Sequence, residues 1–334
     1  MLSAPIAVLG SGSWGTALAI QFARAGKPTR LWGRDAAQLA DMRAARCNRR
    51  YLPDAPFPEL LEVAPSLDAA LHGVSDVLVA VPSSGFRALL TQLAPRLTPE
   101  MRIAWATKGF ERSTGLLPHQ VAHEVLGAKH AMAVLSGPTF AREVGAGLPT
   151  AMVVASTDES FAMRVAEDLA TPGFRTYVST DIRGVEIGGA VKNVIAVGAG
   201  LSDGLGFGAN MRVALITRGL NEMTRLGVAL GAHERTFMGL AGLGDLVLTC
   251  TDDQSRNRRC GLALARGLSV EEAMREIGQV VEGYHAARLL RMVAAKLGLD
   301  LPICEAICRI LFDGADARAV VRELMARPPQ AEFE

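Results

Sequence analysis

The sequence predicts an α/β domain built on a parallel sheet, followed by an all-helical domain. In the first half, short β-branched runs alternate with longer Ala- and Leu-rich stretches, which is typical of strand–helix–strand units. After Thr180 the hydrophobic periodicity becomes mostly helical. We therefore predict two domains, over residues 1–180 and 181–330. The length of 334 residues agrees with this division, because single cores rarely grow beyond roughly 250–300 residues.

The predicted strands are short runs rich in apolar and β-branched residues, and all of them precede the predicted boundary. They are Ile6–Leu9, Thr29–Trp32, Val77–Val81, Ile103–Ala106, Ala131–Leu135, Ala151–Ala155 and Arg175–Val178. Beyond Val185 the chain predicts helices as far as about Ala326.

Composition and charge exclude several classes of protein. The 35 basic and 34 acidic residues nearly cancel, and no long Lys- or Arg-rich run is present, so nucleic-acid binding is not expected. The five cysteines form no CxxC pair, which disfavours a disulfide framework and a zinc site. The apolar runs are broken before the ~18 residues of a membrane span, and the N-terminus lacks the basic region of a signal peptide. We expect a cytoplasmic protein.

A glycine-rich turn follows the first predicted strand. The segment from Gly10 to Gly15 reads GSGSWG, fits the pattern GxGxxG and opens a helical run. Gly10 permits the tight turn, Gly12 lets the backbone approach a pyrophosphate, and Gly15 lets helix and strand pack closely. The helix N-terminus would offer N–H groups to the anion. The pattern predicts a Rossmann-type dinucleotide site, and the alternative is a merely structural turn.

The end of the second predicted strand bears on the choice of cofactor. NAD-selective sites usually place an acidic residue there for the ribose hydroxyls. Here Gly33 takes that position and Arg34 follows it, so a 2′-phosphate would meet a cation, although Asp35 could still reach a ribose. We predict NADP, with NAD possible, and the alternative is that Arg34 simply covers surface.

Two lysines are conspicuous in a chain that otherwise uses arginine. Of the 35 basic residues 30 are Arg and five are Lys. Lys108 follows a predicted strand at its carboxyl end, where ligands bind in open α/β sheets. Lys192 lies in a predicted helix with Gly188 and Gly189 on its own face, so something must approach that face closely. A desolvated lysine can lower its pKa and exchange a proton, whereas arginine cannot. The alternative for Lys192 is a snorkelling side chain at a domain interface.

Several segments offer polar groups suited to a small anion. The turn SGPTFA, from Ser136 to Ala141, supplies a hydroxyl after another strand, although it would also fit a plain loop. A Gly-rich bend carries Asp245. About ten residues later, Arg256 offers bidentate recognition of a phosphate between Ser255 and Asn257, although a solvated basic turn would look the same.

No metal site is predicted from the six scattered histidines. Only His119 and His123 have helical i, i+4 spacing, and no HExxH motif accompanies them. We expect this pair to face solvent.

Taken together, the motifs closely resemble the bacterial NAD(P)-dependent glycerol-3-phosphate dehydrogenases. They run in that family's order over about 85% of the chain. The matching segments are GSGSWGTALA, LWGRD, NRRYLPD, ATKGFE, SGPTFA, GGAVKNVIAV, AGLGDLVLTCT, QSRNRRCG and QVVEG.

The resemblance implies a function and a set of site residues. The chain would reduce dihydroxyacetone phosphate to sn-glycerol 3-phosphate with NADP or NAD, in a cleft between the two domains, and would supply glycerophospholipid synthesis as a homodimer. Lys192 would be the catalytic acid/base, with Asn193 near the substrate. The implied substrate contacts are Lys108, Gly137, Thr139, Asp245, Ser255, Arg256 and Asn257. The implied cofactor contacts, besides Gly10, Gly12 and Gly15 of the turn, are Ser13, Trp14, Arg34, Lys108, Ala141, Arg256, Val280 and Glu282, with Tyr51 a weaker candidate.

One position departs from the family pattern, and two other functions stay open. Thr139 stands where many relatives have Ser, but either hydroxyl can donate the same hydrogen bond. The first alternative is a reductase of the same two-domain shape acting on a β-hydroxyacid or a ketopantoate-like substrate. The second is a non-catalytic dinucleotide sensor.

Overall fold

The computed structural model describes residues 4–328 and 331–332. By compactness the chain divides into two units, of which the first comprises Met1–Gly189 and Gly231–Asp245 and the second Ala190–Leu230 and Leu246–Glu334. The predicted boundary lies between residues 180 and 181, whereas one division between the two units lies between Gly189 and Ala190, within the helix Ile182–Gly204. Residues 1–3 and 329–330 of the two predicted domains lie outside the described part of the chain.

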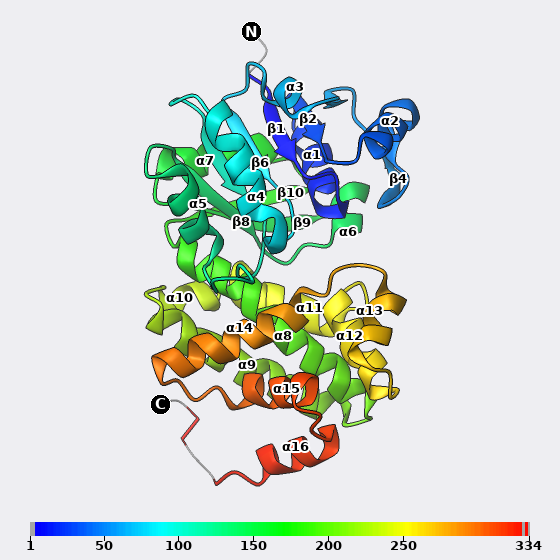
Figure 1. Cartoon of the computed structure of the whole chain (residues 1–334), viewed down its shortest axis with the longest axis vertical. Coiled ribbons are helices and arrows are strands. Elements are labelled where there is room, and N and C mark those ends of the chain that lie inside the picture. The colour runs from blue at the N-terminus through cyan, green and yellow to red at the C-terminus, as the bar shows by residue number, and fades with distance from the viewer. Residues whose placement is uncertain (1–3, 329–330, 333–334) are drawn as a thin grey trace. The chain divides into compact units, whose positions relative to one another are not determined.

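The first unit is built on an eight-stranded sheet (Figure 1). Its strands are β1 (Ile6–Leu9), β2 (Thr29–Trp32), β5 (Leu61–Val63), β6 (Asp76–Val79), β7 (Arg102–Trp105), β8 (Met132–Ser136), β9 (Thr150–Ser156) and β10 (Phe174–Ser179). They follow the order β10-β9-β8-β7-β6-β1-β2-β5. All seven predicted strands are present within two residues of their predicted ends.

The sheet is mostly parallel, as predicted. Strands β8 and β9 pair antiparallel, whereas the other neighbours in the sheet pair in parallel. The short edge strand β5 was not predicted. Neither was the small antiparallel pair of β3 (Cys47–Asn48) and β4 (Leu52–Pro56).

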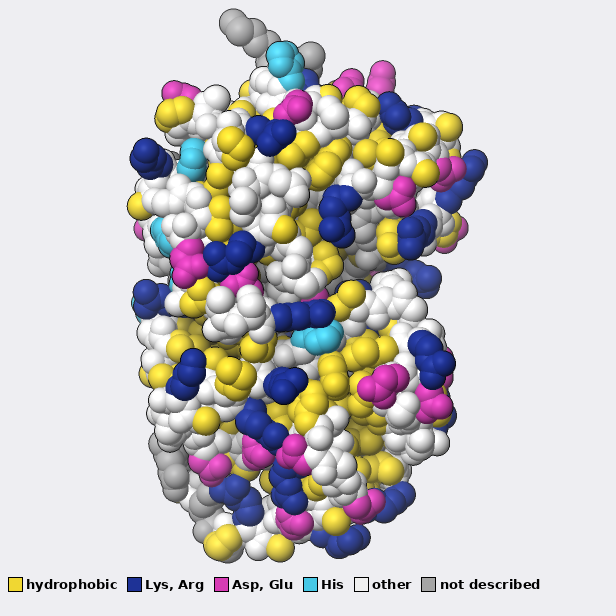
Figure 2. Space-filling model, viewed as in Figure 1, with side chains coloured by type: hydrophobic (Ala, Val, Ile, Leu, Met, Phe, Trp, Pro, Cys, Tyr) yellow, Lys and Arg dark blue, Asp and Glu magenta, His cyan; other side chains and the backbone are white. Residues whose placement is uncertain are grey.

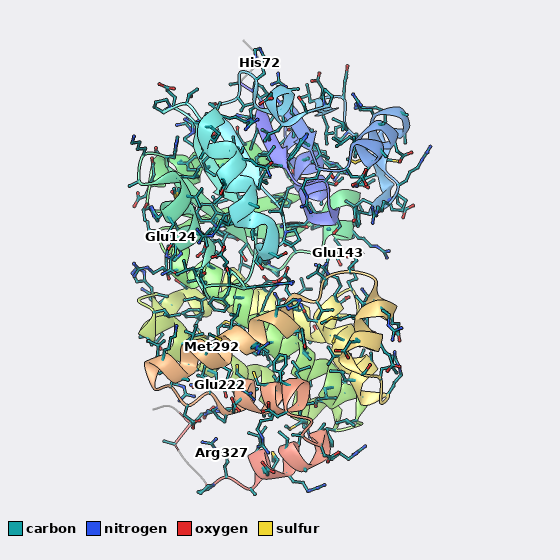
Figure 3. All side chains as sticks on the ribbon, viewed as in Figure 1. His72, Glu124, Glu143, Glu222, Met292 and Arg327 are labelled. Carbon is teal, nitrogen blue, oxygen red and sulfur yellow. The ribbon has the colours of Figure 1, made fainter. Side chains whose placement is uncertain are left out.

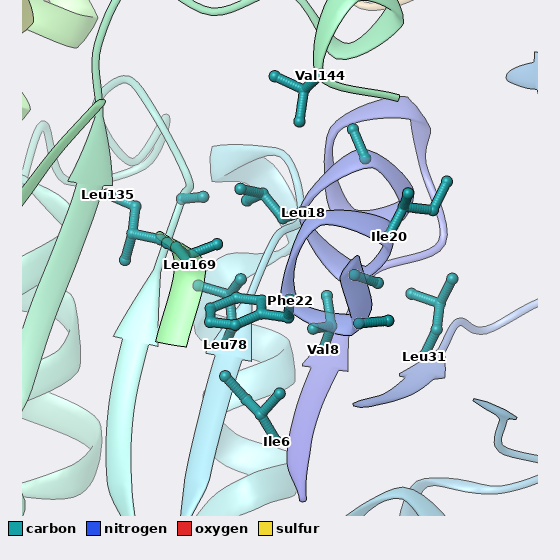
Figure 4. Close-up of a cluster of buried hydrophobic side chains, with 14 of the residues drawn as sticks. Ile6, Val8, Leu18, Ile20, Phe22, Leu31, Leu78, Leu135, Val144 and Leu169 are labelled. Carbon is teal, nitrogen blue, oxygen red and sulfur yellow. The ribbon is translucent and has the colours of Figure 1, made fainter. Parts of the chain in front are cut away.

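The core of this unit lies on both faces of the sheet. Because side chains alternate along a strand, Ile6 and Val8 of β1 join one cluster, and Ala7 and Leu9 join another. Figure 4 shows part of the first cluster, in which Phe22 packs among Ile6, Val8 and Leu78. That face is covered by α1 (Ser13–Arg24), α2 (Ala36–Ala45), α6 (Ala141–Ala146) and α7 (Glu159–Leu169). The other face is covered by α3 (Leu67–Leu71), α4 (Ser83–Leu93), α5 (Pro118–Leu126) and the first residues of α8 (Ile182–Gly204).

After β10 all assigned elements in the described part of the chain are helical, as the sequence predicted. Besides α8, they are α9 (Gly208–Ala229), α10 (Glu234–Phe237), a π-helical turn (Leu240–Gly244), α11 (Asp245–Thr251), α12 (Arg256–Ala265), α13 (Val270–Ile277), α14 (Glu282–Leu297), α15 (Pro302–Phe312) and α16 (Ala317–Met325). Among the described residues, α8 alone is long and apolar enough to cross a membrane. Its apolar window is 100% buried inside the protein, as in the core helix of a folded domain.

Charged side chains of both signs are interspersed on the face drawn in Figure 2. Exposed ion pairs of the protein include Arg266 with Glu276 and Arg309 with Glu323. Such pairs contribute about 0–1 kcal/mol each, so the surface charges add little to the stability of the fold.

Candidate functional site

The glycine-rich turn has the geometry that a phosphate cradle requires. Gly10 has a φ of +131°, and a Cβ there would lie 2.3 Å from the carbonyl oxygen of Ala80 at the end of β6. A Cβ on Gly15 would lie 1.9 Å from the carbonyl oxygen of Gly10, whereas a Cβ on Gly12 would meet nothing within 4 Å. Gly10 and Gly15 thus serve backbone packing, and Gly12 leaves open space at the start of α1.

The turn also lies where a ligand is expected in a sheet of this type. The chain leaves β1 for β2 on one side and returns to β6 on the other, which makes the carboxyl ends of β1 and β6 the topological switch point. Helix α1 begins there, and no side chain caps its N-terminus. The indole Nε1 of Trp14 is buried with no hydrogen-bond partner among the described residues. An uncapped helix N-terminus and an orphaned donor fit the pyrophosphate of a dinucleotide.

The end of β2 disfavours a carboxylate in the ribose position. A Cβ on Gly33 would lie 2.0 Å from the Oγ and 2.7 Å from the Cβ of Ser11, so an acidic side chain there would collide with the Ser11 side chain. Asp35 caps α2, since its Oδ1 accepts hydrogen bonds from the N–H groups of Ala37 and Gln38. Arg34 is exposed. A guanidinium, rather than a carboxylate, is therefore available at this end of the strand.

Lys108 forms a buried ion pair in the first unit. It lies three residues beyond β7, and its Nζ is 2.7 Å from Oδ2 of Asp245 and 3.4 Å from the carbonyl oxygen of Gly137. The Asp245 side chain is only 1% exposed, and that of Lys108 is 19% exposed. The Asp245 carboxylate therefore fixes the position of the Lys108 amine, which is largely shielded from solvent.

Gly189 lies beside the Lys108 side chain. A Cβ at this position of α8 would lie 3.4 Å from Cγ and Cδ of Lys108 and from the Oγ of Ser136. That Oγ is buried and has no hydrogen-bond partner in the described part of the chain. Ser136 was not singled out by sequence, although its place at the end of β8 is the kind of position that marks a ligand contact.

The turn after β8 contains the other predicted residues of this unit. Gly137 has a φ of +148°, and a Cβ there would lie 3.2 Å from the Cα of Met152. The Oγ1 of Thr139 donates to the carbonyl oxygen of Gly137, and Ala141 is the first residue of α6. Residues 137–140 have no regular secondary structure, and the contact between Nζ of Lys108 and the carbonyl oxygen of Gly137 places this segment beside the lysine.

Lys192 lies on α8 in the second unit and is buried, with 6% of the residue exposed. Its Nζ donates to the Oγ1 of Thr249 at 3.1 Å. Lys192 is thus shielded from solvent, which is the environment expected for a lysine that exchanges a proton. Thr249 was missed, although its position one helical turn after Asp245 on α11 was a signal that could have identified it.

The predicted anion-reading segment is a helix N-terminus. Ser255 caps α12, its Oγ accepting from the N–H of Arg258, and Arg256 is the first residue of the helix. The segment is therefore the start of a helix rather than a turn. Burial lowers the pKa of the Arg256 guanidinium, an effect that Glu282 opposes, and its side chain donates to the neutral Oε1 of Gln279 at 3.3 Å. A desolvated guanidinium at a helix N-terminus suits a phosphate.

Asn257 connects α12 to Asn193, which was a predicted position, and to Gly283, which was not predicted to be a site residue. Its Nδ2 donates to Oδ1 of Asn193 at 2.8 Å, and its Oδ1 accepts from the N–H of Gly283 at 2.9 Å. Both asparagines are buried. The predicted cofactor contacts Val280 and Glu282 flank the start of α14, where Glu282 is the first helical residue.

A buried carboxylate in the first unit escaped sequence analysis. Glu186 on α8 accepts hydrogen bonds from Nε1 of Trp105 at 2.8 Å and from the N–H of His119 at 2.9 Å, and it lies 2.5 Å from Nδ1 of His119. Burial raises the pKa of Glu186, and His119 partly offsets this effect. His119 is thus not solvent-facing as predicted, whereas His123 is exposed.

The predicted site residues are distributed over both compact units. Those in the first unit are Gly10, Gly12, Ser13, Trp14, Gly15, Arg34, Lys108, Gly137, Thr139, Ala141 and Asp245; those in the second are Lys192, Ser255, Arg256, Asn257, Val280 and Glu282. Within the first unit the structure brings Lys108 together with Asp245 and Gly137. Within the second it connects Asn257 to Asn193.

The sheet and the glycine-rich turn are those of a Rossmann-type nucleotide-binding protein. The two lysines held by hydrogen bonds are suited to an oxidoreductase of that class. The comparisons with known proteins then identify the family. Residues 5–162 match the model of the N-terminal part of NAD-dependent glycerol-3-phosphate dehydrogenase, and residues 181–322 match the model of its C-terminal part. The chain belongs to this family, which confirms the resemblance found in the sequence.

Individual relatives agree along the whole chain. It is 56% identical over 333 residues to a glycerol-3-phosphate dehydrogenase [NAD(P)+] of Thioalkalivibrio sulfidiphilus, covering 100% of both chains, and 55% identical to that of Aeromonas salmonicida, covering 98% of both. A crystal structure of glycerol-3-phosphate dehydrogenase from Coxiella burnetii superposes with a TM-score of 0.93 at 46% identity, covering 98% of this chain and 100% of the other.

Proposed function

We propose that the chain catalyses reversible reduction of dihydroxyacetone phosphate to sn-glycerol 3-phosphate with NADPH or NADH. Relatives that match over the full length bear the name of this activity. The observation that carries the proposal in the structure is a primary amine, Lys192, that is buried at 6% exposure on a helix and hydrogen-bonded to a hydroxyl. Burial of this kind is how proteins prepare a lysine for proton transfer at neutral pH.

The two lysines would divide the work at the reacting carbonyl. When bound, the nicotinamide supplies the hydride to C2. Negative charge then develops on the C2 oxygen, and Lys192 donates the proton that neutralises it. Lys108, held by Asp245, orients the substrate and stabilises the developing charge. A pairing of Asp245 with Lys192 or with a substrate hydroxyl stays a prediction.

The remaining predicted residues would bind and orient the two reactants. Arg256 fixes the phosphate of the substrate, with Ser255 and Asn257 beside it as neutral hydrogen-bond partners. Gly137 and Thr139 contact the substrate from the first unit. The open space at Gly12 and the uncapped N-terminus of α1 receive the pyrophosphate. Holding both reactants in one orientation would supply much of the rate enhancement.

We infer a preference for NADPH over NADH. The support is steric and electrostatic: a side chain at Gly33 would collide with Ser11, Asp35 is engaged as a helix cap, and Arg34 is exposed for a 2′-phosphate. The further contacts with the cofactor would come from Ser13, Trp14, Ala141, Val280 and Glu282. We further propose that the enzyme acts as a cytoplasmic homodimer whose product supplies glycerophospholipid synthesis.

The test is a steady-state assay that follows the absorbance of the reduced nicotinamide. We expect the purified chain to oxidise NADPH with dihydroxyacetone phosphate, to act poorly on dihydroxyacetone, which lacks the phosphate, and to show a higher kcat/KM for NADPH than for NADH. Equal activity on the two ketones would contradict the phosphate anchor and favour the alternative reductase. Binding of NADPH without oxidation would favour a sensor.

A further inference from the structure

The second unit contains a cavity of about 600 Å³. It is lined by residues of α8, α9, α15 and α16 and by described residues that follow α16, and none of the described lining residues belongs to the proposed catalytic or cofactor set. A volume of this size lies within the range of roughly 300–1,000 Å³ that is typical of small-molecule sites. The cavity is therefore large enough for a ligand and is independent of the proposed reaction.

The shape and lining of the cavity favour an extended aliphatic ligand. On α9 the lining residues run from Met211 to Arg225, a span of about 21 Å along the helix axis. Phe207 is the one aromatic residue among the described lining residues, which disfavours a flat ring that needs stacking partners. The aliphatic part of the wall consists of Leu201, Leu205, Leu215, Ile303, Ile307, Ile310, Val320, Val321 and Leu324.

The charged groups of the lining are already engaged with other parts of the protein. Glu222, labelled in Figure 3, accepts hydrogen bonds from the N–H groups of Ile303 at 2.6 Å and Cys304 at 3.0 Å, at the start of α15. Arg225 donates to the carbonyl oxygen of Asp300, and Arg327 donates to the carboxylate of Asp300 at 2.8 Å.

Arg218 donates to the carbonyl oxygen of Glu332 at 3.0 Å. Three arginines (Arg218, Arg225 and Arg327) face three acidic residues (Glu222, Asp300 and Glu332) around the cavity. Because the charges balance, the lining calls for an uncharged ligand.

One buried side-chain hydroxyl of the lining has no hydrogen-bond partner in the described part of the chain. Ser202 on α8 lines the cavity and is 4% exposed, and its Oγ has no hydrogen-bond partner among the residues that the structure describes. A buried hydroxyl in this state costs free energy unless a water or a ligand satisfies it. The hydroxyl and the aliphatic wall together define a ligand with an apolar body and one hydrogen-bonding group.

We propose that this cavity binds an uncharged molecule with a single aliphatic chain, whose hydroxyl or carbonyl group pairs with the Oγ of Ser202. The apolar surface of the chain is buried against Leu201, Leu215 and Ile307, which supplies most of the affinity, and the hydrogen bond to Ser202 fixes the position of the head group.

Decan-1-ol is the probe, titrated into the full chain by isothermal calorimetry without substrate or cofactor. We expect saturable binding of one molecule per chain. Leu215→Trp fills the cavity and should weaken binding more than tenfold. Thr217→Trp adds the same side chain at an exposed position of α9 outside the lining and should leave the dissociation constant unchanged.

Ser202→Ala tests the hydrogen bond and does not depend on whether the larger substitution folds. It should weaken decan-1-ol binding by about threefold to tenfold, the loss expected for one hydrogen bond. Decanoate, which carries a charged head on the same chain, should bind more weakly than the alcohol. Absence of saturable binding to the unaltered chain, an unchanged dissociation constant in Ser202→Ala, equal losses in the two Trp variants, or tighter binding of decanoate would overturn the proposal.

Discussion

Two neighbouring glycines of α8 allow a direct test of why glycine occurs in the middle of this helix. A Cβ on Gly188 would lie 2.3 Å from the carbonyl oxygen of Ala241, which is a backbone atom and cannot move alone. A Cβ on Gly189 would lie 3.4 Å from the side-chain carbons of Lys108, which is ordinary van der Waals contact. Substitution by alanine gains up to ~1 kcal/mol of helix propensity at either position.

The two substitutions should therefore change stability in opposite directions. In Gly188→Ala the overlap with the backbone costs about 1–3 kcal/mol or more, which exceeds the gain in propensity. In Gly189→Ala we expect the gain to be largely retained, so the free energy of unfolding should stay equal or rise by up to ~1 kcal/mol. Because 1 kcal/mol shifts Tm by about 2–4 °C in a unit of roughly 150–250 residues, the difference between the variants is measurable.

Urea and thermal unfolding followed by circular dichroism, together with kcat, provide the assay. Each variant is the natural control for the other, since both exchange glycine for alanine one residue apart. The methyl group of Gly189→Ala restricts the Lys108 side chain, so kcat/KM should fall although the fold is kept. A Gly188→Ala chain as stable as the unaltered protein would refute the close approach of α8 to Ala241, and unchanged kinetics in Gly189→Ala would refute the need for space beside Lys108.

Four further substitutions test the proposed site and one buried acid. Lys192→Ala should lower kcat by about 10²–10⁴-fold and leave the NADPH dissociation constant within a few-fold; the exposed Lys296→Ala is the control, and near-normal turnover of the Lys192 variant would disprove the assignment. Arg256→Ala should raise KM for dihydroxyacetone phosphate by roughly tenfold to 100-fold, the loss expected for a hydrogen bond to a charged group; an unchanged KM would remove Arg256 as the phosphate anchor. Arg34→Ala should raise KM for NADPH by a similar factor and KM for NADH little, and a parallel rise in both would argue against a 2′-phosphate contact. Burial raises the pKa of Glu222, so the contribution of this residue to stability is present below its ordinary pKa of 4.5 and is lost as pH rises through the pKa of the folded state. The stability of Glu222→Gln relative to the unaltered chain should therefore improve from pH 4.5 upward and then level off. Urea unfolding at a series of pH values measures this difference, and the opposite slope would contradict the argument.

The elements that were predicted well from the sequence are those that are determined by residues close together in the chain. Strands β1 and β2 were placed to the residue because each begins directly after a proline and ends directly before a glycine. The turn after β1 was identified because GxGxxG has a steric reason at each glycine position. The stated role of Gly12, open space for an anion, agrees with the absence of any atom within 4 Å of a Cβ built there.

The elements that sequence missed depend on pairing between distant segments. The antiparallel pairing of β8 with β9 cannot be recognised from the sequence of either strand, because both are largely apolar runs that could pair in either direction. β5 has only three residues, too few for a period to emerge. The boundaries between the two compact units could not be predicted from the sequence either. One of these boundaries lies within α8, whose apolar pattern continues across it without a break.

The same distinction applies to the candidate site. Lys108 and Lys192 stood out because lysine is rare in this chain and each lies in an informative local pattern. Thr249 could have been found from its spacing after Asp245. The hydrogen bonds that hold Glu186 join residues 67 and 81 positions apart, and nothing in the local sequence marks a glutamate as the buried partner of a particular histidine and tryptophan.

Glu186 shows how the frame of the first unit is made rigid next to Lys108. Its carboxylate is held by the indole of Trp105, the last residue of β7, and by the backbone and ring of His119 on α5. Desolvating a carboxylate is costly, and three donors on two other elements offset that cost only if strand and helices keep their relative positions. Lys108 lies three residues beyond β7, and Gly189 lies three residues after Glu186 on α8, so the amine and the glycine beside it belong to elements joined by the same buried acid. Replacing Glu186 by an apolar residue would remove the shared partner of Trp105 and His119, and we expect this to loosen the attachment of β7 and α5 to α8.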